Sequence, residues 1–250
     1  MQIDPKERAL LQFSGGKDST ALLYLCRPWL DRITVLFADT GAVYPHVVEF
    51  VHETCNKLGA NLQVVRPKES VIEFTNREGL PSDIIPLEAM REVQWMHRDK
   101  APQLIQSWLK CCTAMIFEPL NAAVKESGIK TVLRGSKKAD SRVGAVDGHV
   151  ADGITYLSPL WNWSHADVFR YLAKQGVTLP KQYNGASENI DSIDCYICTG
   201  HLKRYGAAKV KWTKDNCPDL WPELSRRLGA LREAIDSERA VLGASFDLVG

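Results

Sequence analysis

LLQFSGGKDST, residues 10–20, joins a strand, a glycine turn and a helix start within one short stretch. Ala9–Phe13 is apolar at all but one position, which is typical of a buried strand in a parallel sheet. Ser14–Gly16 predicts an abrupt turn, and Asp18 and Ser19 favour the start of a helix. Backbone N–H groups at such a helix start, with a lysine beside them, favour a bound phosphate or sulfate.

The rest of the chain continues this alternation of strand and helix. Further strands are expected at 33–38, 62–65, 131–134 and 154–157. Helices are expected from Pro45 to Gly59, at 70–74, at 108–125 with a kink near Pro119, and at 164–174. Gly79–Pro86 is expected to be a loop. Such alternation predicts an α/β fold, a Rossmann-like parallel sheet with helices on both faces.

We expect two domains. Residues 1–176 would form the nucleotide-binding α/β domain, and residues 177–250 a loop-rich, helical C-terminal appendage. The chain has 250 residues, of which 45% are apolar and 24% charged, as in a globular protein. No apolar run is long enough to span a membrane, and the first residues do not resemble a signal peptide, so we expect a cytoplasmic protein without a membrane partner.

The segment SGGKDS matches neither the Walker pattern nor the GxGxxG dinucleotide pattern. It resembles the PP-loop of the adenine nucleotide alpha-hydrolase-like superfamily, which includes ATP pyrophosphatases, tRNA thiolases, ATP sulfurylase small subunits and phosphoadenylyl-sulfate (PAPS) reductases. The alternative is an ordinary glycine-rich turn. Four further segments resemble PAPS reductases, in the same order along the chain: FADTGAVYPHVVEF at 37–50, GSKKADSR at 135–142, SPLWNWSHADVFRYL at 158–172 and DCYICT at 194–199.

The chain has seven cysteines, which in a cytoplasmic protein favours metal ligands or thiols over a disulfide framework. Cys111-Cys112 is a tandem pair, and Cys195 and Cys198 form a CxxC motif. The resemblance to the iron–sulfur branch of the family, the adenylyl-sulfate (APS) reductases, implies that these four thiolates hold a [4Fe–4S] cluster, for which they are the usual ligand set. A Cys₄ zinc site and unliganded thiols are the alternatives.

The same resemblance implies a site for ATP, or for PAPS or APS. The residues expected to bind the nucleotide are Ser14, Gly15, Gly16, Lys17, Asp18, Ser19, Asp39, Thr40, Gly41 and Gly135. The residues expected to act in catalysis are Lys17, Asp18, Lys137 and Arg142. Asp18 or Asp39 would help to hold Mg²⁺, and the lysines would stabilise phosphate charge. For Lys137 and its neighbour, a solvated surface loop is the alternative.

Lys203–Lys214 is rich in lysine and arginine, with Tyr205 and Trp212 interleaved. The stretch would contact a nucleic-acid backbone and stack a base, or it would be a solvated helix face. The formal net charge of the whole chain is only +1, so any attraction to nucleic acid would be local.

The complete SGGKDS form favours an enzyme that splits ATP into AMP and pyrophosphate. We expect an ATP pyrophosphatase that activates a substrate for sulfur transfer, in DNA phosphorothioation or tRNA thiolation, with a sulfur donor such as a cysteine desulfurase. The tail GASFDLVG lacks the cysteine that sulfonucleotide reductases carry. The first alternative is a PAPS or APS reductase that forms sulfite with Cys217 or a partner thiol and a thioredoxin-like reductant. The second is a non-catalytic nucleotide- or metal-binding subunit of a larger complex.

Overall fold

The computed structural model describes residues 7–84, 104–140, 146–183 and 195–246, in two compact units. One unit comprises Met1–Asp39, Val43–Pro67 and Ile116–Ala186 and is called the sheet unit below. The other comprises Thr40–Ala42, Lys68–Met115 and Ser187–Gly250 and is called the cysteine unit, because it holds the tandem pair and the CxxC motif. The expected appendage began at 177, whereas the cysteine unit also takes in residues 68–115.

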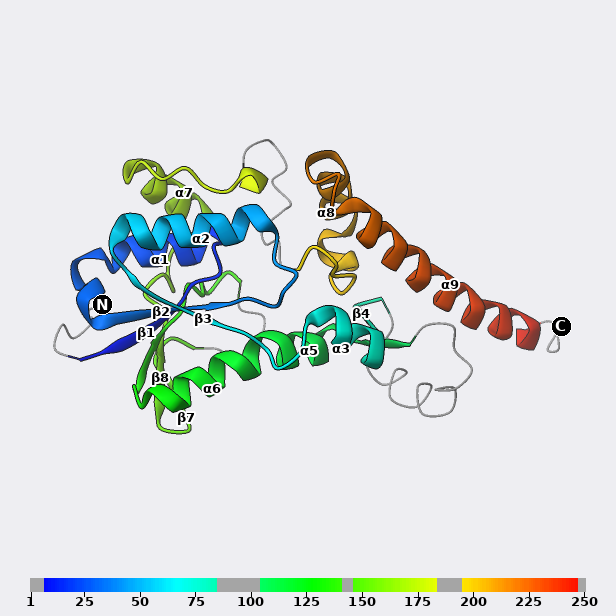
Figure 1. Ribbon diagram of the computed structural model, residues 1–250, viewed down its shortest axis with the longest axis horizontal. Helices are drawn as coiled ribbons and strands as arrows, with labels where there is room; N and C mark the ends of the chain where they lie inside the picture. Colours follow the sequence, from blue (N-terminus) through cyan, green and yellow to red (C-terminus); the bar gives the residue numbers. More distant parts are fainter. Residues whose placement is uncertain (1–6, 85–103, 141–145, 184–194, 247–250) are drawn as a thin grey trace. The chain divides into compact units, whose positions relative to one another are not determined.

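The sheet unit is built on a six-stranded sheet with the order β3-β2-β1-β6-β8-β7 (Figure 1). The strands are β1 Ala9–Gln12, β2 Ile33–Ala38, β3 Asn61–Val65, β6 Thr131–Leu133, β7 His149–Ala151 and β8 Ile154–Leu157. Every pairing is parallel except that of β7 with β8. The predicted Rossmann-like α/β fold is therefore confirmed.

Helices cover both faces of this sheet (Figure 1), because successive strand residues point to opposite sides. Leu11 packs in one apolar cluster with residues of α1 Lys17–Leu25, α2 Pro45–Leu58 and α7 His165–Lys174. Its neighbour Leu10 packs in a second cluster with residues of α6 Glu118–Ser127. The short helices η1 Arg27–Arg32 and η3 Lys181–Tyr183 complete the unit.

The cysteine unit contains four α-helices and a pair of short strands among its described residues. Its elements are α3 Val71–Glu78, β4 Leu80–Ser82, β5 Ile105–Ser107, α5 Trp108–Cys112, α8 Leu202–Asn216 and α9 Trp221–Phe246. β4 and β5 pair in parallel, so part of the expected loop at 79–86 is a strand. The expectation failed there because a three-residue strand containing a proline has almost no sequence signature.

The expected helix at 108–125 is interrupted where the kink near Pro119 was anticipated. A π-helical segment, η2 Thr113–Phe117, separates α5 from α6, and Pro119 lies in the first turn of α6. Proline donates no hydrogen bond and crowds the carbonyl four residues earlier, so regular α-helix cannot continue through it. None of the helices in the described ranges is long and apolar enough to cross a membrane.

Candidate functional site

The glycine turn between β1 and α1 requires its first glycine. Gly15 has a φ of 75°, in the left-handed region that side chains disfavour. A Cβ atom there would also lie 2.9 Å from Cγ1 of Val47 and 3.0 Å from Cγ2 of Val51, both on α2. The turn is therefore fixed by close packing against α2 as well as by backbone conformation.

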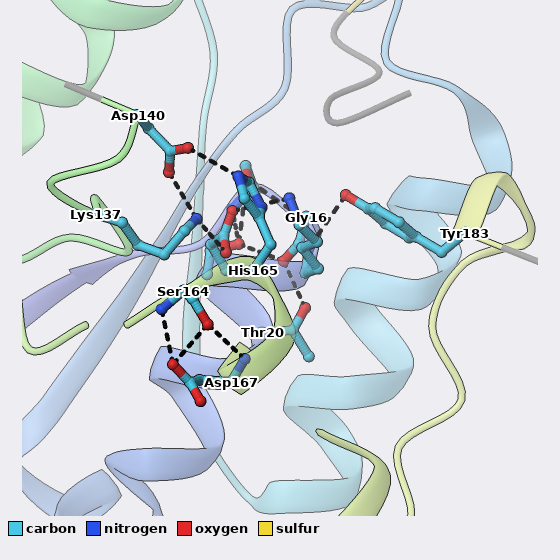
Figure 2. A network of polar contacts seen from close by, with 12 residues as sticks. Gly16, Thr20, Lys137, Asp140, Ser164, His165, Asp167 and Tyr183 are labelled. Atoms are coloured by element: carbon cyan, nitrogen blue, oxygen red, sulfur yellow. Dashed lines mark hydrogen bonds and ion pairs between the residues drawn. The ribbon is translucent and has the colours of Figure 1, made fainter. Parts of the chain in front are cut away.

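Hydroxyl groups brace the turn. The Ser19 and Thr20 hydroxyls donate to the Gly16 carbonyl at 3.0 and 2.8 Å. The backbone N–H of Lys17 donates to the Tyr183 hydroxyl oxygen at 3.2 Å, and Figure 2 shows Tyr183 reaching the turn from η3. A braced helix N-terminus keeps its amide dipoles oriented, which is what an anion site requires.

Gly135, two residues after the end of β6, lies against the first turn of α1. A Cβ atom at this position would be 2.9 Å from the backbone nitrogen of Ser19 and 3.0 Å from the carbonyl carbon of Asp18. Only glycine lets the loop after β6 approach the helix this closely.

We expect Gly135→Ala to lower the free energy of unfolding by about 1–3 kcal/mol, because the added methyl group meets backbone that cannot rotate away. Denaturant unfolding monitored by circular dichroism measures this change. Gly229→Ala is the matched control, since a Cβ there has no atom within 4 Å and should not destabilise the chain. Equal stability of Gly135→Ala and the parent would contradict the close packing.

A network of charges surrounds the N-terminus of α1 (Figure 2). The Lys137 side chain is 0% exposed, and its Nζ lies 2.6 Å from Oδ1 of Asp18 and 2.6 Å from Oδ2 of Asp140. Nζ of Lys17, another buried lysine, is 3.2 Å from Oδ2 of Asp18. His165 Nε2 extends the network at 3.4 Å from Oδ1 of Asp140. Two lysines thus converge on one carboxylate beside the glycine turn.

Lys137 is buried, whereas its neighbour Lys138 is exposed. A lysine ammonium leaves water only where carboxylates compensate its charge, as Asp18 and Asp140 do here. Lys138 is exposed and so fits the solvated loop. Arg142, the other predicted catalytic residue of this segment, lies outside the described residues.

The predicted nucleotide residues after β2 are divided between the two units. Asp39, in the sheet unit, pairs with Arg66 at 3.0 Å. Thr40 and Gly41 belong to the cysteine unit, where the Thr40 hydroxyl lies 3.1 Å from Sγ of Cys195. The Thr40 hydroxyl also accepts the N–H of Ala42 at 3.3 Å, so Thr40 links its own loop to the CxxC motif.

The CxxC motif is a tight turn held from several sides within the cysteine unit. The Cys198 N–H donates to the Cys195 carbonyl at 3.1 Å. Nζ of Lys209, on α8, donates to the carbonyls of Cys195 and Cys198 at 3.0 and 3.3 Å. The Thr199 hydroxyl donates to the Pro81 carbonyl at 2.6 Å. These bonds fix the backbone that carries the two thiols.

The tandem pair approaches this turn through α5. A Cβ at Gly200 would lie 2.7 Å from Cβ of Trp108 and 3.4 Å from Sγ of Cys198, so the start of α5 packs directly against the end of the motif. Burial, together with the charge of Cys198, raises the pKa of Cys111 to about 12. The two cysteine pairs, far apart in sequence, are therefore neighbours in this unit.

The described residues contain no group of three or more His, Cys, Asp or Glu side chains already arranged as metal ligands. Cys195 instead contacts Thr40, and burial favours the protonated form of Cys111 by raising the pKa of its thiol. Metal binding displaces such protons and reorients the side chains. The donor set itself, four cysteines on two segments that meet, fits an iron–sulfur cluster or zinc.

Comparison with known proteins assigns the family. The model of the phosphoadenosine phosphosulfate reductase domain matches residues 8–201. The chain belongs to this family. A phosphoadenosine 5'-phosphosulfate reductase of Enterobacter sp. is 26% identical over 69% of this chain and 64% of its own length. An uncharacterized protein of Methanocaldococcus jannaschii is 24% identical over 87% of this chain and 47% of its own length. The chain thus spans between about half and two thirds of the length of these relatives.

The fold is shared with a solved member of the family. The phosphoadenylyl-sulfate reductase from Candida auris, solved as a phosphate complex, superposes with a TM-score of 0.50 at 21% identity. The similarity covers 71% of this chain and 77% of that one. The residues that the family model matches end before α8 and α9.

Several residues of this PAPS reductase family member were not predicted as site residues. Asp140 lies in the segment GSKKADSR, and the resemblance of this segment to PAPS reductases is the signal that could have found it. Tyr183, His165 and Lys209 had none, since each reaches its partner from a distant part of the chain.

The basic stretch 203–214 lies on α8, and two of its residues cannot serve a nucleic acid as expected. Trp212 is 8% exposed, so its ring is not available to stack a base. Lys209 is 5% exposed and binds the CxxC carbonyls. Lys211 is exposed but pairs with Asp215. The prediction was wrong for Lys209 and Trp212 because their helical face is buried. The side chains of Arg204 and Tyr205 lie outside the described residues.

Proposed function

We propose that this chain is an ATP pyrophosphatase that activates an oxygen of its substrate for sulfur transfer. The observation that carries the proposal is the pair of buried lysines, Lys17 and Lys137, meeting at Asp18 beside the glycine turn. Asp18 and Asp140 compensate the buried ammonium groups in the absence of a ligand, and at a helix N-terminus the same lysines can exchange these carboxylates for the oxygens of a multiply charged anion. Together with the complete SGGKDS sequence, this favours a nucleotide triphosphate as the ligand.

In this proposal the α1 N-terminus and the Ser14 and Ser19 hydroxyls hold phosphate oxygens, and the lysines stabilise their charge. A substrate oxygen attacks the α-phosphorus of ATP. The bond from that phosphorus to its bridging oxygen breaks, and pyrophosphate leaves with the electron pair. Incoming sulfur then displaces AMP from the activated position. The protein contributes mainly orientation and charge stabilisation, as is usual in such transfers.

Asp18 suits the Mg²⁺ that would accompany ATP. Its carboxylate is partly exposed, and both of its oxygens contact lysine ammonium groups. Magnesium usually takes one or two carboxylates, with phosphate oxygens and water completing its shell. A single aspartate beside a phosphate-binding turn therefore fits the ion. Mg²⁺ would draw this carboxylate away from the lysines and leave them to the phosphates.

We assign Cys111, Cys112, Cys195 and Cys198 to a [4Fe–4S] cluster, which would bind sulfide or tune the site electrostatically. The two neighbouring pairs in the cysteine unit, with Lys209 fixing the CxxC turn, support this assignment. A cysteine desulfurase is the class of sulfur donor that the proposal requires. DNA phosphorothioation and tRNA thiolation are the acceptor reactions that fit it.

A sulfonucleotide reductase is the second candidate, favoured by the relatives that carry this name and by the Candida auris neighbour. In this chain Cys217 is 7% exposed, in the turn from α8 to α9. Its carbonyl accepts the N–H groups of Leu220 and Trp221. A buried thiol in a structural turn is badly placed to attack a nucleotide sulfate. Reduction by this chain would therefore need a thiol from a partner, such as a thioredoxin-like reductant.

We expect Cys217→Ser to leave nucleotide turnover within about twofold of the parent, because surface access controls cysteine reactivity and Cys217 has almost none. The measurement is initial-rate release of pyrophosphate from ATP, and of sulfite from PAPS and APS. Loss of sulfite formation in this variant, with the fold intact, would make Cys217 the nucleophile and favour the reductase.

The decisive experiment is anaerobic purification followed by metal analysis and turnover on the same sample. Pyrophosphate and AMP from ATP would support the proposal, with sulfide and a nucleic-acid acceptor added in turn. Sulfite from PAPS or APS would select the second candidate. No turnover by the isolated chain, with co-purification of a partner, would indicate a nucleotide-binding subunit. About four irons and four sulfides per chain would support the cluster, whereas stoichiometric zinc would refute it.

A further inference from the structure

Arg227 is a buried cation that the proposed chemistry leaves without a role. It lies on α9, beyond the residues that the family model matches, and its side chain is 1% exposed. Its Nε lies 2.7 Å from Oε1 of Glu223, and its Nη1 donates to the Thr75 hydroxyl at 2.8 Å. Its Nη2 is buried and has no hydrogen-bond partner within the described part of the chain. An unmatched N–H of a buried guanidinium calls for an explanation.

The charge of Arg227 is only partly compensated by its surroundings. Glu223 also binds Arg226, with Oε1 2.8 Å from Nη2 of that residue. Hydrogen bonds from Arg226, and then Arg227, hold the pKa of Glu223 at about 2. One carboxylate therefore faces two guanidinium groups, and the three residues together carry a formal charge of +1. Arg226 is exposed to water, so the surplus positive charge that is shielded from solvent lies on Arg227.

Cys111, the first cysteine of the tandem pair, lies within the electrostatic reach of this guanidinium. Thr75, which Arg227 binds, belongs to α3, and α3 contacts α5, the helix of Cys111. A buried guanidinium with a spare N–H thus lies beside the place where four thiolates would gather.

We propose that Arg227 is the fixed counter-charge of the cysteine site, with its Nη2–H donated to a thiolate sulfur. Four thiolates around an iron–sulfur cluster or a divalent metal leave the site negatively charged, and the low dielectric of the interior strengthens a nearby cation. Arg227 stabilises the more negative, reduced form of a cluster more than the oxidised form. It is a positioning and tuning residue, not a ligand. The inference rests on the metal-site half of the proposed function.

The test is the midpoint reduction potential of the reconstituted cluster, measured by dye-mediated anaerobic titration. Arg227→Gln should shift the equilibrium about tenfold toward the oxidised form, a fall of about 59 mV for one electron. Arg227→Lys keeps a positive charge at this position, so its midpoint potential should stay close to that of the parent. Arg226→Gln is the matched control, because it removes an exposed guanidinium from the same carboxylate, and its shift should be much smaller.

Glu223→Gln changes the net charge near the cysteine site in the opposite direction to Arg227→Gln. It removes the carboxylate and keeps the guanidinium, so the potential should rise. A merely structural role for Arg227 would not give shifts of opposite sign in the two variants. If Arg227→Gln does not fold, the inference is tested by whether the midpoint potential rises in Glu223→Gln. An unchanged potential in every folded variant would overturn the inference.

Failure of the cluster assignment is distinguishable from failure of this inference. If the parent chain holds no iron, Co²⁺ alone is titrated into the metal-free chain and its thiolate charge-transfer absorption is followed. Arg227→Gln should then weaken Co²⁺ binding about tenfold, about 1.4 kcal/mol, while Arg226→Gln does not. Equal Co²⁺ affinity of the parent and Arg227→Gln would overturn the role of Arg227, whatever metal the site holds.

Discussion

Lys137→Met should lower the rate of pyrophosphate release from ATP by about 10²–10³-fold, the usual loss when one group that stabilises transition-state charge is removed. The side chain of Lys137 is fully buried, so water cannot take the place of its ammonium group. Methionine is similar in length and apolar, and therefore removes the charge with little change in packing. Steady-state kinetics at saturating ATP and Mg²⁺ measure the effect on kcat.

Lys138→Met is the matched control for this variant. The same side-chain change is made one residue away, where the lysine is exposed, and kcat should stay within about twofold of the parent because an exposed charge is screened by water and salt. Circular dichroism checks that both variants fold, since removing Lys137 leaves Asp18 and Asp140 without their shared cation. Equal kcat for the two variants would remove Lys137 from the proposed machinery.

Cys112→Ser should reduce the bound iron from about four atoms per chain to less than about one, because a hydroxyl is a poor substitute for a thiolate at a cluster. Cys112 is only partly buried, so serine should not disturb the fold of the metal-free chain. Iron and sulfide analysis, with the visible absorption of the cluster, measures the loss after identical anaerobic purification.

Cys55→Ser is the control for this substitution. Cys55 lies on α2 in the sheet unit, where burial raises its pKa to about 11, and it takes no part in the proposed ligand set. Iron content should be unchanged in this variant. Full iron occupancy in Cys112→Ser would exclude the tandem pair as joint ligands, and equal loss in both variants would point to general destabilisation.

Local patterns predicted the sheet unit well. The strands at 33–38 and 154–157 were placed with their observed bounds, and α2 ends at Gly59, whose φ of 65° gives the expected C-cap. The helix expected from residue 164 begins with Ser164 as its N-cap, whose hydroxyl accepts a hydrogen bond from the Asp167 N–H. These features succeed because they depend on residues within a few positions of one another.

The partners within the candidate site depend on contacts across the chain, and the sequence did not reveal them. The resemblance indicated a role for Lys137, but its burial between Asp18 and Asp140 follows only from the packing of the β6 loop on α1. Thr40 was predicted as a nucleotide-binding residue, and no local pattern indicated its contact with Cys195, far along the chain. A sequence motif can indicate that a residue has a functional role, whereas the contacts that the residue makes depend on the whole fold.

The charges around the glycine turn have a consequence for which form of a nucleotide can enter. Lys17 and Lys137 are matched in formal charge by Asp18 and Asp140. A bare polyphosphate would bring several negative charges to a balanced group and would meet the repulsion of both aspartates. A polyphosphate already complexed with a divalent ion brings its own compensation, and the ion offers Asp18 a new partner. The site would thus favour the metal complex over the free nucleotide, because Asp18 can exchange its lysine partners for the divalent ion. This preference would not depend on contacts with the base.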